Sequence, residues 1–364
     1  MLVSSLEARD FRSLAALELE LEQGITSVVG DNGTGKTNVL EAVYFGLSGR
    51  SFRTRDRREL IRFGESVARA ELVLRPDPQT THSLLASASR SEGRRHLLDG
   101  EAAAPAVIAS HRPHLVVFSP DRLVLVKGPP AERRAHFDRF IAARWPARAD
   151  LRQEYGQVLA QRNALLRRAA ADLSPASELD AWDSTLANAA VPLIAARADA
   201  ESELAPRFAA AAEQLGLKDA ELRYAPRSEP GAEALRAGLG ERRDSDLRRA
   251  RTTLGPHLDE FDLNLGARSL RRYGSQGEQR AGLLALLFAE RETLIGAGSP
   301  APLMLLDDVM SELDPAHREL LADRLSGSGQ TLVSAADEEA LPSSAAERLM
   351  RMPSGTSTGL RVVA

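Results

Sequence analysis

A glycine-rich stretch near the start of the chain has the residue types and spacing of a phosphate-binding loop. The stretch "GDNGTGKT", residues 30–37, fits the pattern G-x-x-x-x-G-K-[ST] and holds one of only three lysines among 364 residues. In this pattern backbone amides curl around the phosphates, Lys36 reaches the β and γ phosphates, and Thr37 offers its hydroxyl to Mg2+. The sequence therefore predicts a site for ATP and Mg2+. The expected nucleotide contacts are Gly30, Asp31, Asn32, Gly33, Thr34, Gly35, Lys36, Thr37 and Asn38.

The setting of this stretch supports the same prediction. It follows an apolar run at residues 25–29, which predicts a buried strand, and it precedes a segment with helical spacing that stops at Gly46 and Gly49. A loop between a strand and a helix places the positive end of the helix dipole at the phosphates. We therefore expect a P-loop here.

Two adjacent acids supply the partner that a P-loop needs. In "LMLLDDVMSELD" four apolar residues, Leu303–Leu306, predict a buried strand whose end carries Asp307 and Asp308. We expect Asp307 to bind Mg2+ together with Thr37, and Asp308 to polarise the attacking water. A solvated turn or a helix cap is the alternative, but a P-loop in the same chain favours catalysis. Asp314 is most simply the cap of a helix opened by Pro315.

A third polar cluster, "YGSQGEQ", stands ahead of a long apolar run. Ser275 and Glu278 form a capping box, which needs no ligand. Gly277 costs about 1 kcal/mol against alanine inside a helix, so it indicates that something approaches the backbone closely. A helix start with free amides is an anion site, and we expect Ser275, Gln276 and Gly277 to bind the γ-phosphate of ATP held by another copy of the chain. ATP would then lie within a homodimer interface, with Ser275 acting beside Lys36 and Asp308 in catalysis.

Size and composition exclude several classes of protein. The length suggests two domains, or one domain with a large insertion. No apolar run approaches the ~18 residues of a membrane span, and the N-terminus lacks the basic start and apolar core of a secretory signal. The absence of cysteine excludes disulfides and thiolate metal sites. We expect a cytoplasmic protein with no membrane partner.

Arginines gather in two segments, residues 50–64 and residues 132–170, although the formal net charge is -4, and either segment could form a patch that faces phosphates. Residues 50–64, "RSFRTRDRRELIRFG", carry six arginines against two acids, just beyond the helix that leaves the P-loop. Such a cluster can face the phosphates of DNA or the adenosine side of ATP, and a solvated loop is the alternative. The candidate DNA contacts are Arg53, Arg55, Arg57 and Arg58.

A helical block separates two sheet-forming parts of the chain. Before it, residues 17–22 and 25–29 predict two strands, and further strands are expected in "ARAELVLRP", "HSLLASAS", "RRHLLDG" and "HLVVFSP". Helical spacing dominates from about residue 132 to 251. Strands return in "HLDEFDLNLG", "PLMLLDD" and "QTLVSA", the last of them before a polar tail.

The order of P-loop, helical insertion, "GSQGEQ" and acidic strand is that of ABC-type ATPase heads. The predicted fold is α/β, with a mixed sheet flanked by helices and an inserted helical domain. We expect the head at residues 1–127 and 252–364, with the P-loop at 30–37, the signature at 275–279 and the acidic strand at 303–308. The helical arm is expected at 128–251.

With these motifs the sequence resembles the RecF family, bacterial recombination ATPases of the SMC-like ABC group. The resemblance covers nearly the whole chain and rests on "GDNGTGKTNVLEAV", "VVFSPDRLVLVKGPPAERRAHFDRF", "YGQVLAQRNALLR", "TTLGPHLDEFDLNL", "YGSQGEQR" and "LLDDVMSELD". It implies a weak, DNA-stimulated ATPase whose ATP-driven dimer clamps duplex DNA or junctions of single- and double-stranded DNA. It also implies work with RecO and RecR in loading RecA onto gapped DNA during repair and replication.

The sequence departs from the family pattern at two places. Leu258 in "GPHLDE" stands where the family has an arginine, so a phosphate contact by that arginine is not carried over. The strand "TLVSAAD" has no histidine at the position of an ABC switch histidine. His257 could contact nucleotide or a partner, but a loop histidine satisfied by the backbone is the favoured interpretation.

Two other functions compete with the DNA clamp. A transporter ATPase subunit would have two adjacent glycines in the signature, a glutamate after Asp307 and a switch histidine, whereas this chain has Gln276, Asp308 and "SAAD". A DNA scaffold with negligible hydrolysis is the other alternative, because the carboxylate of Asp308 is one methylene shorter than that of glutamate.

Overall fold

The computed structural model describes residues 1–171, 176–313, 315–326, 329–342, 345–346 and 348–353. The chain forms two compact units. The first unit joins Met1–Arg122 to Gly298–Ala364, and the second unit is Leu123–Ala297. The P-loop and the two acids belong to the first unit, and the signature stretch belongs to the second.

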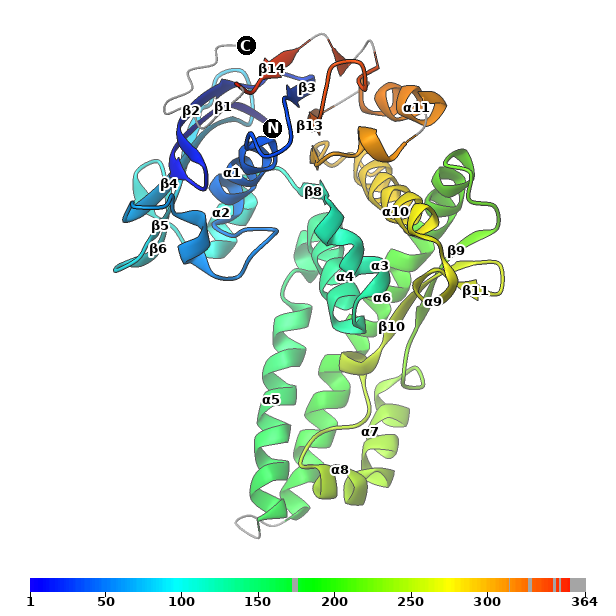
Figure 1. The fold of residues 1–364 in the computed structure, drawn as a ribbon. Helices are drawn as coiled ribbons and strands as arrows, with labels where there is room; N and C mark the ends of the chain where they lie inside the picture. The colour runs from blue at the N-terminus through cyan, green and yellow to red at the C-terminus, as the bar shows by residue number, and fades with distance from the viewer. Residues whose placement is uncertain (172–175, 314, 327–328, 343–344, 347, 354–364) are drawn as a thin grey trace. The chain divides into compact units, whose positions relative to one another are not determined.

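An antiparallel sheet with the strand order β2-β1-β4-β5-β6-β7 makes one layer of the first unit (Figure 1). One residue in two along β4 is fully buried, from Ala68 to Leu74, because only one face of the sheet lies against the core. The strands are β1 (Leu2–Phe11), β2 (Leu14–Glu20), β4 (Val67–Arg75), β5 (His82–Ser89), β6 (Gly93–Leu98) and β7 (Glu101–Ala102).

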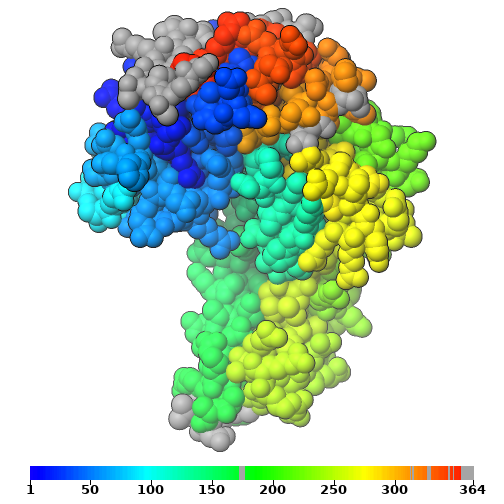
Figure 2. Space-filling model, in the orientation of Figure 1, coloured from blue at the N-terminus to red at the C-terminus, as the bar shows by residue number. Residues whose placement is uncertain are grey.

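A parallel sheet with the order β14-β3-β13-β12-β8 makes the other layer. Its central strands are buried along almost their whole length, as expected when both faces of a sheet are covered, although β3 and β13 also bury polar side chains. N-terminal and C-terminal parts of the chain therefore share one surface in this unit (Figure 2). The strands are β3 (Gly24–Val29), β8 (Leu115–Phe118), β12 (Leu303–Leu306), β13 (Gln330–Ala335) and β14 (Leu349–Arg351).

Helix α1 (Lys36–Ser48) lies between these two sheets, with contacts to β4 and β5 on one side and to β3 and β13 on the other. Its C-terminal cap is Gly49, as predicted. Gly46 does not end the helix; a Cβ there would lie 2.1 Å from Leu72 Cδ1, so this glycine permits close packing on β4. The first unit also contains α2 (Pro105–Ser110) and α11 (Pro315–Ser326).

The second unit is built around α6 (Leu179–Gln214), a helix of 36 residues. Figure 1 shows α5 running beside α6, with α7 and α8 at the same end of the pair. The sheet β11-β10-β9 and helix α10 also pack against this group. The other elements are α3 (Val124–Lys127), α4 (Pro130–Arg144), α5 (Leu151–Ala170), β9 (Ala220–Ala225), α7 (Ala232–Glu241), α8 (Arg243–Arg249), β10 (Glu260–Leu265), β11 (Arg268–Ser269), α9 (Leu270–Tyr273) and α10 (Gln276–Gly296).

Some arginines of the helical block are structural. Arg162, which is fully buried, donates to Asp183 over 2.7 Å and to Asp246 and Thr252 over 2.8 Å. This network joins α5, α6 and α8, and because its charges have close partners their burial is tolerated.

The structure differs from the sequence-based expectations at several places. Three strands, not two, precede residue 30 among the described residues, because β1 was missed. Strand β9 lies within the predicted helical block, and β14 follows the strand that we expected to be last. Residues 252–297, expected with the head, pack within the second unit, where α10 lies against α6. Asp314 lies outside the described residues.

Among the helices of the described residues, none combines the length and apolar character required to cross a membrane.

Candidate functional site

The predicted P-loop connects β3 to α1, as its pattern requires. Gly35 has φ 103° and a Cβ there would lie 2.9 Å from Ser13 Oγ. Gly30 has φ 151° and a Cβ there would lie 2.9 Å from Met352 Cβ. Both positions thus need glycine for the backbone angle and for the close approach of a neighbouring segment. The space beside Gly33 is open, since a Cβ there would meet nothing within 4 Å.

Lys36 lies against the backbone of the loop that it follows. Its Nζ donates to the carbonyl oxygens of Gly30 over 2.5 Å and Asp31 over 3.0 Å. Thr34 Oγ1 also donates to the Asp31 carbonyl, over 2.9 Å. The ammonium group is therefore held at the mouth of the loop, where the P-loop pattern needs a positive charge.

Thr37 and Asp307 meet at the head of α1. Thr37 Oγ1 donates to Asp307 Oδ1 over 2.8 Å. Oxygen ligands at ~2.1 Å around an octahedral Mg2+ lie about 3 Å from their neighbours, so the Thr37 hydroxyl and the Asp307 carboxylate group are close enough to bind the same ion. Few protein ligands are expected, because Mg2+ in nucleotide sites keeps waters and phosphate oxygens. Among the described residues there is no group of three or more acidic, histidine or cysteine side chains that could hold a metal ion.

Burial sets the electrostatics of Asp307. Loss of solvent raises the pKa of its carboxyl, while the hydrogen bonds from Thr37 and Ser334 oppose that shift. Asp308 raises this pKa further and the charge of Arg53 lowers it. The raised pKa shows that a buried negative charge here is costly, and a bound cation would relieve that cost.

Asp308 occupies an unusual backbone conformation. Its φ is 53°, in the left-handed region that aspartate tolerates better than most residues. Its Oδ1 is buried and has no hydrogen-bond partner among the described residues. Its backbone N–H donates to Ser334 Oγ over 2.8 Å. A carboxylate oxygen without a partner beside a phosphate site suits contact with a water or a substrate atom.

Ser334 is not among the residues predicted from the sequence. This residue is fully buried near the end of β13, and its Oγ donates to Asp307 Oδ1 over 2.8 Å. Only the pairing of β12 with β13 brings the two residues together. A serine close to the end of a buried strand, next to a strand that ends in acids, is the signal that could have indicated it.

The predicted signature residues cluster at the start of α10, in the second unit. The capping box is present, with the Glu278 N–H donating to Ser275 Oγ over 3.2 Å and the Ser275 N–H donating to Glu278 Oε2 over 2.7 Å. Ser275, Gln276 and Gly277 are exposed, and a Cβ on Gly277 would meet nothing within 4 Å. Helical amides at Gln276 and Gly277 have no intrahelical acceptor. The capping box is therefore formed while Ser275, Gln276 and Gly277 stay exposed.

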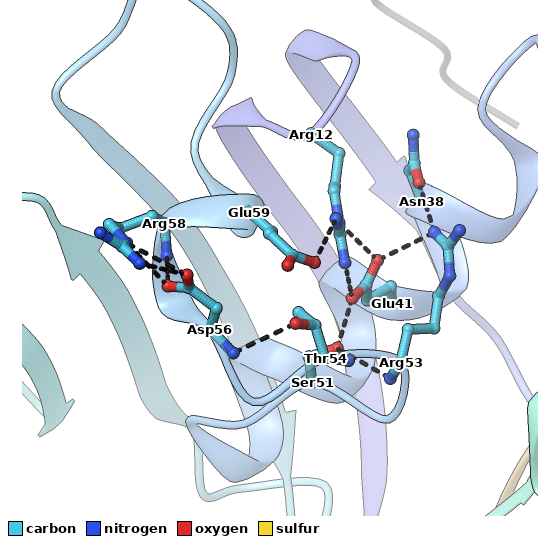
Figure 3. Close-up of polar contacts among 9 residues, drawn as sticks. All are labelled: Arg12, Asn38, Glu41, Ser51, Arg53, Thr54, Asp56, Arg58 and Glu59. Carbon is cyan, nitrogen blue, oxygen red and sulfur yellow. Dashed lines mark hydrogen bonds and ion pairs between the residues drawn. The ribbon is translucent and has the colours of Figure 1, made fainter.

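The four arginines predicted to contact DNA have different surroundings (Figure 3). Arg53 Nη1 contacts Asn38 Oδ1 at 3.1 Å and Glu41 Oε2 at 3.3 Å. Arg58 pairs with Asp56, which its hydrogen bond holds at a pKa of about 2. Arg57 Nε donates to the Ser89 carbonyl, and Arg55 is exposed. Arg53, Arg55 and Arg58 are all exposed, and Arg53 also contacts two side chains of the P-loop helix.

Glu41 is a second residue that sequence reasoning missed. Its carboxylate is fully buried on α1 and accepts from Arg12 Nε over 2.9 Å, from Arg12 Nη2 over 2.8 Å and from Ser51 Oγ over 2.5 Å (Figure 3). With Arg53 it fixes the arginine segment to the P-loop helix. A single glutamate in an amphipathic helix gives no sequence signal for such a role.

His257 is satisfied within the second unit, which agrees with the favoured interpretation. Its Nδ1 lies 2.7 Å from Tyr155 Oη and its Nε2 lies 3.1 Å from the Thr252 carbonyl. Its neighbour Asp259 is fully buried and accepts from the Arg197 guanidinium and from Tyr224 Oη. The "GPHLDE" stretch thus joins α5, α6 and β9.

Comparisons with known proteins match this chain to one family. A family model described as the RecF/RecN/SMC N-terminal domain matches residues 2–358. The DNA replication and repair protein RecF of Streptomyces avermitilis is 37% identical over 362 residues, covering 94% of this chain and 95% of that protein. RecF of Heliobacterium modesticaldum is 36% identical over 335 residues, covering 89% of each chain.

A solved structure gives the same result for the fold. The structure of the recombination mediator protein RecF with ATP, from the RecFOR pathway, matches with a TM-score of 0.83 and 25% sequence identity. The match covers 93% of each chain. The chain is thus similar, in sequence and in fold, to RecF proteins.

Proposed function

The chain belongs to the RecF family of DNA replication and repair proteins, which have an SMC-like ATPase fold, and on this premise we propose that it is an ATP-gated DNA clamp. In this proposal ATP joins two copies around DNA and slow hydrolysis releases them. The homodimer, the DNA contact and the roles of individual residues are all part of this proposal.

The contact between Thr37 and Asp307 is the observation that carries the proposal. It brings a P-loop hydroxyl and a strand-end carboxylate to hydrogen-bond distance, as a site for Mg2+ and ATP requires. Lys36 would neutralise charge on the β and γ phosphates, and the amides of the P-loop would orient them. Thr37 and Asp307 would hold Mg2+, which supplies charge neutralisation at the phosphates. Asp308 would orient and polarise the attacking water.

The start of α10 would complete the site from a second copy. Ser275, Gln276 and Gly277 are exposed and offer a hydroxyl and two amides to an anion. Arg271 and Arg272, exposed just before them, add positive charge. In this arrangement each ATP is bound by the P-loop of one copy and by the signature residues of the other, so binding and dimerisation are coupled.

The arginine segment is the candidate DNA surface of the first unit. Contacts from Arg55 and Arg58 to phosphates give affinity without reading sequence, which suits a protein that recognises DNA structure. We place the protein in the cytoplasm, with RecR, RecO and RecA as its partners, because its relatives are DNA replication and repair proteins and one similar structure comes from the RecFOR pathway. Stimulation of ATP turnover by DNA belongs to the same proposal.

The test is binding of a labelled gapped duplex, followed by fluorescence anisotropy with ATP, with ADP and without nucleotide. The proposal expects tight binding with ATP alone, and a Lys36→Ala variant that loses the effect of ATP. Equal binding in all three conditions would contradict a nucleotide-gated clamp.

A further inference from the structure

Three strand ends meet beside the P-loop, and one hydroxyl links two of them. Ser334, near the end of β13, donates to Asp307 Oδ1 over 2.8 Å and accepts from the Asp308 N–H over 2.8 Å. Asp307 and Asp308 directly follow β12, the neighbour of β13 in the parallel sheet. A single buried side chain therefore contacts both of the acids that the proposed reaction uses.

The hydrogen bonds of Ser334 determine which oxygen of Asp307 is available. A serine hydroxyl has one hydrogen to donate, and here it goes to Oδ1, the same oxygen that accepts from Thr37. Within the described part of the chain, no recorded donor reaches Asp307 Oδ2. Two hydroxyl groups thus fix the carboxylate in one orientation and leave its second oxygen for a further ligand.

The same hydroxyl fixes the backbone on which Asp308 stands. Asp308 has φ 53°, and its N–H, which lies beyond the ladder of β12, takes Ser334 Oγ as its acceptor. Ser334 itself cannot shift readily, since it is fully buried on a strand that pairs with β3 on one side and β12 on the other. Without this acceptor the Asp308 N–H would lose a partner and the direction of the carboxylate would be less defined.

We propose that Ser334 is a positioning residue of the ATP hydrolysis site, which orients Asp307 for the metal and holds Asp308 toward the attacking water. Ser334 lies in the stretch "TLVSAAD", which has no histidine at the position of an ABC switch histidine. This inference rests on the proposed ATPase site and concerns a residue that acts through its neighbours. Ser334 does not touch the nucleotide in this account.

The test compares Ser334→Ala, Ser334→Thr and Ser27→Ala in the full-length protein. Ser27 is a matched control, because it is equally buried on the adjacent strand β3 and its Oγ donates to the Ala345 carbonyl over 2.6 Å. Each alanine variant loses one buried hydroxyl, but only one of the two hydroxyls reaches the acids. The measurements are binding of a fluorescent ATP analogue against Mg2+ concentration, and the rate of phosphate release at saturating ATP.

We expect Ser334→Ala to raise the Mg2+ concentration for half-maximal binding and to lower kcat, each by about tenfold to a hundredfold, as for removal of other groups that orient metal ligands. Binding of the analogue without Mg2+ should stay as in the wild type. Ser334→Thr keeps the hydroxyl and should restore both quantities. Ser27→Ala should lower thermal stability without moving the Mg2+ midpoint.

Two different failures can be told apart. If ATP binding by the wild type does not depend on Mg2+, the proposed metal site is wrong, and so is the role of Ser334. If ATP binding by the wild type needs Mg2+, but Ser334→Ala and Ser27→Ala have the same Mg2+ midpoint and the same kcat, only the role of Ser334 is overturned.

Discussion

The hydroxyl of Thr37 donates to the carboxylate of Asp307 over 2.8 Å, although 270 residues separate them along the chain. The two residues are fixed independently, Thr37 by the first turn of α1 and Asp307 by the end of β12. Parallel pairing of β3, β13 and β12 aligns the carboxyl ends of these strands at one edge. The site therefore depends on sheet topology as much as on its motifs, as in other open α/β folds.

Asp307→Asn should stabilise the nucleotide-free protein at neutral pH. The pKa of Asp307 is raised in the folded state, chiefly by burial, so the folded protein binds this proton more readily than the unfolded chain. Keeping the group ionised above that pKa therefore costs stability, and the cost disappears as the pH falls below the ordinary value. Thermal unfolding from pH 4 to 8 should show a higher Tm for the variant at pH 7 and a smaller difference at pH 4.

The same variant should lose Mg2+-dependent ATP binding by at least about tenfold, since it lacks the ligand charge itself. Asparagine still accepts from Thr37 and Ser334 through its carbonyl oxygen, so local geometry is retained. A variant less stable than the wild type at pH 7 would show that ionised Asp307 is well compensated in the nucleotide-free protein.

Asp308→Asn should separate catalysis from binding. Asparagine tolerates the left-handed backbone at φ 53° as aspartate does, so the fold at this position should persist. If Asp308 polarises the attacking water, turnover should fall by about a hundredfold or more, the usual contribution of a general base. The variant should still form the ATP-bound dimer. Unchanged phosphate release would remove Asp308 from the role of base and favour the scaffold with negligible hydrolysis.

Glu41→Gln should destabilise the first unit. Glu41 is fully buried and pairs with Arg12 and Arg53, so its neutralisation removes the ion pair of Arg53 and leaves Arg12 with only the longer contact to Glu59, at 3.8 Å. Breaking a buried pair costs about 3 kcal/mol, and the partial exposure of both arginines makes this an upper value. Urea denaturation gives the free energy of unfolding directly. The exposed pair of Asp56 and Arg58 is the control, because Arg58→Ala should leave the unfolding curve almost unchanged.

DNA affinity should depend on the exposed arginines. An Arg55→Ala and Arg58→Ala double variant should bind DNA more weakly, and the slope of log K against log salt should fall by about 0.9 for each phosphate that the variant no longer neutralises. Anisotropy titrations at several salt concentrations measure both quantities. Arg58→Lys retains the charge and should keep the slope. A double variant with the wild-type slope would place the DNA contact elsewhere.

The motifs could be predicted from the sequence because each lies within one short segment. The P-loop, Asp307 with Asp308, and the capping box at Ser275 are short patterns whose geometry follows from the element that carries them. The roles of Ser334 and Glu41 could not be predicted. The role of Ser334 arises from strand pairing, and that of Glu41 from helix packing, in both cases between segments far apart in sequence.

The missed strands have a similar explanation. Strand β9, "AELRYA", has the alanine, arginine and leucine composition of the helices around it, and its pairing with β10 overrides that local tendency. Strand β14 has only three residues and is defined by β3 beside it. In both cases the partner strand, rather than the local sequence, decides the structure.

Molar mass by light scattering tests the central claim, that ATP joins two copies through the start of α10. The samples are wild type, Ser275→Asp and Ser275→Asn, each without nucleotide, with ADP and with ATP. Aspartate and asparagine both cap helices well and have nearly the same shape, so the two variants differ chiefly in a negative charge facing the γ-phosphate. We predict that the wild type dimerises only with ATP, that Ser275→Asn retains dimerisation, and that Ser275→Asp binds ATP but stays monomeric. A wild-type mass unaffected by ATP, or a Ser275→Asp variant that dimerises as well as Ser275→Asn, would contradict the account.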